Sequence, residues 1–157
     1  VEALKAKAAD KCLDVSIDAQ EDNLKINANR FLLEQMFINL IDNAVKYTPD
    51  GGKVGISLGR KNSSISIEIS DTGIGIPEKN IPKLFEPFFT TKKKGKGVGL
   101  GLSVAYGIIQ EHGGYIYVIS KEGKGTTFQV KFPLKRASEK LDPHGGRSEQ
   151  NQDSNRG

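Results

Sequence analysis

Two glycine-rich segments contain the residues of this sequence that are best suited to chemistry. The first reads Asp71-Thr72-Gly73-Ile74-Gly75-Ile76-Pro77, and the second reads Gly97-Val98-Gly99-Leu100-Gly101-Leu102. Glycines at this spacing let backbone N–H groups approach a ligand and point at it, which is how proteins hold phosphate groups. Two such segments, the first opened by a carboxylate, make a nucleotide site the leading hypothesis.

A helix predicted to start after Asn29, a suitable N-cap, and to end before the turn at 48–52 carries two different stripes. The apolar stripe has the helical period and consists of Leu33, Met36, Phe37, Leu40, Ile41 and Ala44. The polar stripe lies about a third of a turn away and consists of Gln35, Asn39, Asp42, Asn43 and Lys46. Its amides, carboxylate and ammonium are suited to Mg²⁺ and phosphate oxygens. A polar stripe alone is more often a solvated helix face, but the downstream glycine segments favour the functional interpretation.

Asp71 follows a predicted strand in which Ile67 and Ile69 alternate as core residues. A carboxylate at this place can accept a hydrogen bond from an exocyclic amine, which would select adenine over guanine. Gly73 and Gly75 would then let the backbone pass close to the purine ring. The alternative is an Asx-turn that only starts a loop.

Residues 85–101 are expected to form a long mobile loop, because they are rich in Gly and Lys. The Lys92–Lys96 run could reach phosphates, although such a run is more often simply solvated. Phe85, Phe88 and Phe89 have two open interpretations, as core residues or as a latch or partner-facing patch.

The remaining pattern predicts an α+β two-layer sandwich, in which a mixed, mainly antiparallel sheet carries about three helices on one face. Helices or helical turns are expected at 2–12, 78–84 and 102–112. Strands are expected at 14–19, 24–26, 53–60, 63–70, 115–120 and 126–133, with a tight turn at Lys61-Asn62. The polar tail 136–157 is expected to be disordered.

The composition is that of one globular domain: 157 residues, 36% hydrophobic, 27% charged and a net charge of +4. No RNP-like or zinc-finger spacing is present, so nucleic acid is not an expected partner. A single cysteine, Cys12, favours a reducing compartment, and we expect a cytoplasmic domain whether or not the parent protein is membrane-anchored. Because the sequence opens on Val1, we expect it to be a fragment of a longer protein.

Four segments together resemble the N, G1, F and G2 boxes of two-component sensor histidine kinases. In order, they are Phe37–Pro49 (FINLIDNAVKYTP), Asp71–Pro77 (DTGIGIP), Leu84–Phe89 (LFEPFF) and Gly97–Leu102 (GVGLGL). The resemblance covers nearly all of residues 1–134. It implies the Bergerat ATP-binding fold shared with gyrase, Hsp90 and MutL.

The resemblance also implies a role for each matching residue. Asn43 would coordinate Mg²⁺ with Asn39 nearby, and Lys46 would contact phosphate; these three are the expected catalytic residues. Tyr47 would line the adenine pocket, and Ile76 would be among the residues that contact the nucleotide. Asp71 would bind the adenine amine, and the other residues expected to contact ATP or ADP are Gly73, Gly75, Lys92, Gly97, Val98, Gly99, Leu100, Gly101, Leu102 and Thr126.

ATPases of this fold have a Glu one helical turn before the Mg²⁺ asparagine, where this chain has Asn39. An amide cannot act as a general base near neutral pH, so ATP should be held without rapid hydrolysis. Neither histidine, His112 or His144, begins the pattern of a dimerisation helix. We therefore expect residues 13–135 to be the ATP-binding catalytic domain and residues 1–12 to be the end of a linker from a missing dimerisation domain.

The expected function is binding of ATP·Mg²⁺ and transfer of its γ-phosphoryl group to a histidine on a phosphoacceptor (dimerisation) domain, normally in the same polypeptide. A response regulator would act downstream, and the isolated domain is expected to be monomeric. Two alternatives are a Ser-directed kinase of the same superfamily and a nucleotide-sensing module without transfer. A Rossmann domain fits poorly, because Gly97–Leu102 follows a lysine loop and not a strand.

Overall fold

The structure is a computed structural model that describes residues 2–21, 24–91 and 98–134. Its helices are α1 (Glu2–Asp10), α2 (Arg30–Tyr47) and α3 (Gly101–Glu111), and η1 (Glu78–Lys83) is a short 3₁₀ helix. Its strands are β1 (Asp14–Ala19), β2 (Lys53–Lys61), β3 (Ser64–Asp71), β4 (Tyr115–Lys121) and β5 (Gly125–Pro133).

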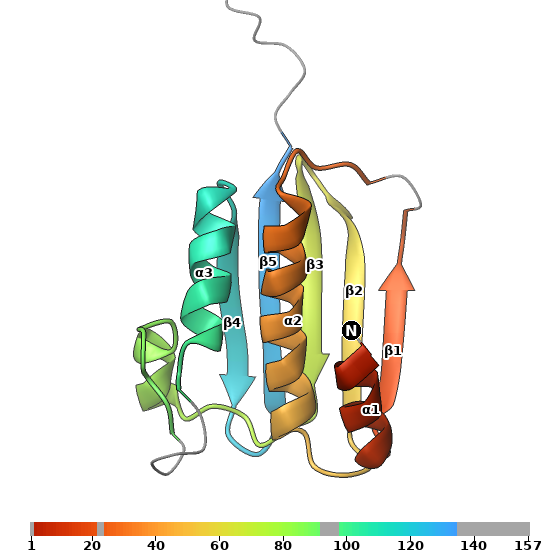
Figure 1. The fold of residues 1–157 in the computed structure, drawn as a ribbon, viewed down its shortest axis with the longest axis vertical. Helices are drawn as coiled ribbons and strands as arrows, with labels where there is room; N and C mark the ends of the chain where they lie inside the picture. Colours follow the sequence, from red (N-terminus) through yellow and green to blue (C-terminus); the bar gives the residue numbers. More distant parts are fainter. Residues whose placement is uncertain (1, 22–23, 92–97, 135–157) are drawn as a thin grey trace, which may run out of the picture.

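The strands form one mixed sheet in the order β1-β2-β3-β5-β4. The β1–β2 pair is parallel because α2 provides the crossover between them, and the other three pairs are antiparallel. Helices α1, α2 and α3 all cover the same face of the sheet (Figure 1). The predicted α+β two-layer sandwich is therefore confirmed.

Helix α2 forms the centre of the core through its apolar stripe. Met36 and Leu40 are fully buried between the sheet and α3, against residues such as Ile69, Val130 and Ile109. The predicted N-cap is confirmed, because the Asn29 side-chain oxygen accepts hydrogen bonds from the N–H groups of Phe31 and Leu32 at 3.0 and 3.2 Å.

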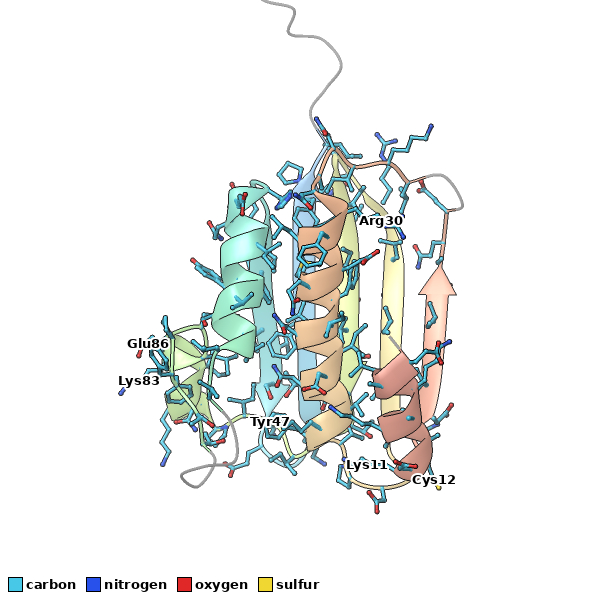
Figure 2. The ribbon with its side chains drawn as sticks, viewed as in Figure 1. Lys11, Cys12, Arg30, Tyr47, Lys83 and Glu86 are labelled. Carbon is cyan, nitrogen blue, oxygen red and sulfur yellow. The ribbon has the colours of Figure 1, made fainter. Side chains whose placement is uncertain are left out.

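A lysine that follows α1 fixes the C-terminal end of α2. Lys11 Nζ donates to the carbonyl oxygens of Val45 at 2.9 Å, of Lys46 at 3.2 Å and of Thr48. A cation at this position satisfies carbonyls that have no partner within the helix and complements the helix dipole. Figure 2 shows Lys11 and Tyr47 at this end of α2 and Arg30 at the opposite end.

Two local predictions were wrong. Residues 24–26 do not form a strand; Leu24 and Ile26 instead pack against the core as irregular chain, which buries them without a ladder. The turn between β2 and β3 lies at Asn62-Ser63 and not at Lys61-Asn62, because Asn62 adopts a φ of +56°, which Asn tolerates better than Lys. The predicted tail 136–157 lies outside the described residues.

Within the described part of the chain, none of the helices is both long enough and apolar enough to cross a membrane.

Substituting a residue of this core should destabilise the fold strongly. Leu40→Ala removes a fully buried side chain and should lower the free energy of unfolding by about 2–5 kcal/mol, measured by urea denaturation. Ile17→Ala is the control, because Ile17 is 74% exposed on β1 and should change it by less than about 0.5 kcal/mol. Equal losses in the two variants would contradict the assigned core.

Candidate functional site

A cavity of about 620 Å³ is lined by residues from the ends of α2 and β3 and from the start of α3. Figure 1 shows that these parts of the three elements lie at the same end of the sandwich. The size of the cavity is within the range of small-molecule sites. Three segments far apart in the sequence contribute most of its wall: the last turns of α2, the first glycine segment and the second glycine segment.

Most of the residues predicted from the sequence line this cavity. They are Asn39, Asn43, Lys46, Tyr47, Asp71, Gly75, Ile76, Val98, Gly99, Leu100, Gly101, Leu102 and Thr126. Gly73 is not in the wall, and its N–H instead donates to Asp71. Lys92 and Gly97 lie outside the described residues. The roles assigned to these side chains remain predictions.

Asp71 is held at the end of β3 by two backbone N–H groups. Its Oδ1 accepts from Gly73 N at 2.8 Å and from Thr126 N at 3.3 Å. Burial raises the pKa of the Asp71 carboxyl above its ordinary value, and the two N–H groups offset part of this rise. Since both N–H groups bind Oδ1, and no hydrogen bond to Oδ2 is found among the described residues, Oδ2 is available to a ligand.

The first glycine segment is attached to the hairpin between β4 and β5. Gly123 N donates to the Ile74 carbonyl at 2.7 Å, and Ile76 N donates to Ser120 Oγ at 2.9 Å. Gly75 has a φ of +71°, and a Cβ there would collide with the carbonyl oxygen of Lys121. Glycine at this position is therefore required by packing as well as by conformation.

The polar face of α2 supplies neutral and charged groups to the cavity. Asn39, Asp42, Asn43 and Lys46 all line it, whereas Gln35 does not. Gln35 Nε2 instead donates to Asn39 Oδ1 at 3.3 Å, which directs the Asn39 amide. Asp42 also forms an ion pair of 2.7 Å with Lys7 of α1, so α1 contacts the cavity wall indirectly.

The side-chain oxygen atoms on this face of α2 fit a Mg²⁺ ion that binds together with a triphosphate. No cluster of three or more His, Cys, Asp or Glu side chains is found in the part of the chain that the structure describes. The amide oxygens of Asn39 and Asn43 could therefore supply only part of a six-oxygen shell. Mg²⁺ typically takes one or two protein oxygens and completes its shell with phosphate oxygens and water.

The three phenylalanines have different surroundings, and Phe89 lines the cavity. Phe85 packs against the core and stacks on Tyr106, with ring centroids 5.2 Å apart. Phe88 is instead 70% exposed, has a φ of +65°, and donates its N–H to the Gly99 carbonyl at 2.9 Å. This bond joins the phenylalanine segment to the second glycine segment. Figure 2 shows Lys83 and Glu86 of the same region projecting away from the helices and the sheet.

His112 is the C-cap of α3. Its Nδ1 lies 2.7 Å from the Ile108 carbonyl, and its Nε2 accepts from Asn29 N at 3.1 Å. The contact with Asn29 joins the end of α3 to the start of α2, at the opposite end of α3 from the cavity (Figure 1). His144 lies outside the described residues.

Several wall residues were not predicted from the sequence, among them Lys79, Asn80, Thr90, Thr91, Glu122 and Phe128. Polar residues in a short helical turn, such as Lys79 and Asn80, do not differ in pattern from a solvated surface. Phe128 could have been found, because it lies two residues after Thr126 in a strand and therefore on the same face.

The chain is similar in sequence to known proteins. Residues 28–136 match the family described as histidine kinase-, DNA gyrase B-, and HSP90-like ATPase. Sporulation kinase A of Bacillus subtilis (strain 168) is 47% identical over 116 residues, which are 74% of this chain and 19% of that protein. The chain thus spans about a fifth of the length of that curated relative.

Solved structures show the same architecture. The catalytic domain of histidine kinase ThkA, in a nucleotide-free form, matches with a TM-score of 0.74 and 32% identity, covering 84% of this chain and 86% of that one. ThkA in complex with response regulator protein TrrA matches with a TM-score of 0.71 and 30% identity, covering 86% of this chain and 39% of that one. The chain therefore belongs to the family of histidine kinase-, DNA gyrase B- and HSP90-like ATPases, and its fold is that of a histidine kinase catalytic domain.

Proposed function

We propose that this chain binds ATP with Mg²⁺ and donates the γ-phosphoryl group to a histidine on a separate phosphoacceptor domain, as part of a two-component sensor kinase. The observation that carries the proposal is one cavity with an acceptor carboxylate, Asp71, in its wall together with the amide and ammonium groups of α2. The family match to ATPases and the similarity to kinase catalytic domains support it.

The two chemically distinct parts of the wall suit the two ends of ATP. Asp71 Oδ2 would accept from the adenine amine, with Gly75 and Ile76 beside the ring. The first turn of α3 would face the phosphates; its N-cap residue, Leu100, makes no side-chain capping bond, so these N–H groups are not capped by a side chain. Uncapped N–H groups and the positive end of the helix dipole favour an anion.

Lys46 and Asn43 would act at the transferred group. The Lys46 ammonium would stabilise negative charge on the phosphate oxygens, since phosphoryl transfer depends mainly on positioning and electrostatics. Asn43, with Asn39 beside it, would hold Mg²⁺, which neutralises phosphate charge when bound. Asn39 has no basic group to take a proton from water, so hydrolysis should be slow.

In the transfer step, a ring nitrogen of the acceptor histidine forms a bond to the γ-phosphorus while the bond from that phosphorus to the β,γ-bridging oxygen breaks. ADP leaves with the electron pair of the broken bond. The acceptor must approach from outside, because His112 lies at the far end of α3. Val98 lines the cavity, and its exposed side chain, with those of Phe88 and Val104 in neighbouring segments, suits an apolar helix of the acceptor domain.

We further propose a response regulator as the downstream partner, since the related ThkA is found in complex with one. A cytoplasmic site of action is consistent with Cys12, which is free and exposed.

The proposal predicts transfer to histidine without comparable hydrolysis. The chain, labelled ATP and Mg²⁺ are mixed with a helical domain that carries a phosphoacceptor histidine and with one that offers only serines. The label should move to the histidine domain as an acid-labile phosphate. Transfer to serine, or rapid multiple-turnover release of phosphate by the chain alone, would show that the assignment is wrong.

Removing the proposed Mg²⁺ ligand should weaken binding. Asn43→Ala should lower the affinity for ATP·Mg²⁺ by at least about 10-fold in isothermal titration calorimetry, because ligand groups and their supports typically contribute that much. The difference from the unsubstituted chain should largely disappear when Mg²⁺ is chelated. Glu34→Ala is the matched control on the outer face of the same helix, where the one ion pair of Glu34 within the described ranges is with Arg30 at 2.8 Å. A Mg²⁺-independent loss would argue against a metal role.

Asp71→Asn should separate stability from binding. The Asp71 pKa is higher in the folded state than in the unfolded chain, so the ionised carboxylate destabilises the fold at neutral pH. This destabilisation disappears as the pH falls below the pKa of an Asp side chain in the unfolded chain, which is about 3.9. The neutral Asn should therefore raise the melting temperature at pH 7, and this advantage should shrink toward pH 3.

The same variant should bind ATP at least about 10-fold more weakly, since Oδ1 can still accept from Gly73 and Thr126 while an NH₂ group then faces the adenine amine. Unchanged ATP affinity in Asp71→Asn would remove the proposed adenine contact.

A further inference from the structure

Three strand residues form a row across the end of the sheet beside the cavity. Asp71 of β3 is paired with Thr126 of β5, and Thr126 is paired in turn with Ser120 of β4. Asp71 and Thr126 line the cavity, whereas Ser120 does not. Ser120 is therefore one strand removed from any ligand there.

The Ser120 hydroxyl has three hydrogen-bonding partners, all at 2.9 Å. Ile76 N donates to Oγ, Oγ donates to the Gly125 carbonyl, and Oγ also contacts Thr126 Oγ1. A hydroxyl has one proton and two lone pairs. The Gly125 carbonyl can only accept, so it takes the Ser120 proton, and the contact with Thr126 must be a bond that Thr126 donates. This arrangement alone satisfies all three contacts.

The consequence for Thr126 follows from the same count. Its only hydroxyl proton is directed to Ser120, so the lone pairs of its Oγ1 are all that it can offer to a ligand. Thr126 is 7% exposed, which leaves little room for water to provide another arrangement. Asp71 Oδ2 is likewise an acceptor, so the two side chains of the row that line the cavity both present acceptors to it.

We propose that Ser120 is a positioning residue that fixes the Thr126 hydroxyl as an acceptor and thereby excludes purines with an oxygen at position 6. This inference rests on the proposed function, because it assumes that the base lies beside Asp71. With the base in the same position, an amine at position 6 can donate to such a wall, whereas a carbonyl oxygen there brings no proton to either acceptor. A site whose hydrogen-bonding groups are fixed as acceptors strongly rejects a ligand that cannot donate to them.

The test compares ATP·Mg²⁺ with ITP·Mg²⁺, which has an oxygen at position 6, a proton on N1 and no amine at position 2. Dissociation constants are measured calorimetrically for the unsubstituted chain, Ser120→Ala, Thr126→Val and the double variant. In Ser120→Ala the Thr126 hydroxyl is free to turn and donate, so the preference for ATP over ITP should fall by about 10-fold. When Thr126→Val is already present, adding Ser120→Ala should leave the preference unchanged, because no hydroxyl remains to be oriented.

A purely structural role for Ser120 would have a different signature. Losing the acceptor of Ile76 N would then weaken both nucleotides equally and leave their ratio unchanged, which would overturn the inference. So would a ratio in the double variant that differs from the ratio in Thr126→Val alone. If the unsubstituted chain binds ATP and ITP equally, both the proposed adenine site and the inference fail. If the unsubstituted chain prefers ATP and Ser120→Ala leaves that preference unchanged, only the inference fails.

A second measurement needs no variant. NMR of slowly exchanging hydroxyl protons in the unsubstituted chain should show a nuclear Overhauser effect between the Thr126 hydroxyl proton and the Ser120 methylene protons. A Ser120 hydroxyl proton directed at Thr126 would contradict the proposal even if every variant failed to fold.

Discussion

A half-buried carboxylate at the end of β3 is the group on which the site depends. Burial disfavours the charge of Asp71, and two backbone N–H groups offset part of that cost. One of them belongs to Gly73 in the turn that follows β3, and the other to Thr126 on the neighbouring strand. The antiparallel register between β3 and β5 therefore decides where this carboxylate lies in the cavity wall.

Helix α2 performs two tasks because its two stripes have the same period and different directions. Its apolar stripe is buried in the core, and the polar stripe carries Asn39, Asn43 and Lys46 to the cavity. Both ends of the helix are fixed by groups outside it. At the start, His112 accepts from Asn29 N, and at the end, Lys11 satisfies the last carbonyls. The polar side chains thus stand on a helix that is anchored at both ends, which reduces the rearrangement that binding requires.

The sequence predicted what depends on period and composition. The long amphipathic helix, its Asn29 cap, both hairpins and the helices on one face of a mixed sheet all follow from local patterns. Most wall residues could be named because they fall within four short segments in a recognisable order.

Residues 24–26 were misassigned because two apolar residues with one polar residue between them suit either a strand or irregular packed chain. Lys79, Asn80 and Glu122 reach the cavity only through tertiary folding, and nothing in their local sequence marks them. Ser120 was missed for a related reason, since its contacts arise from strand register across the β4–β5 hairpin.

The close packing around Gly75 affects how homologous chains are classified as active or inactive from their sequences. Any side chain there would strike the main chain of the β4–β5 hairpin, so the glycine is demanded by architecture before chemistry makes any demand of its own. A descendant that had lost all use for phosphate compounds would still have to retain it. Bioinformatic surveys that infer activity from a retained glycine at this position would therefore count inactive homologues as active ones.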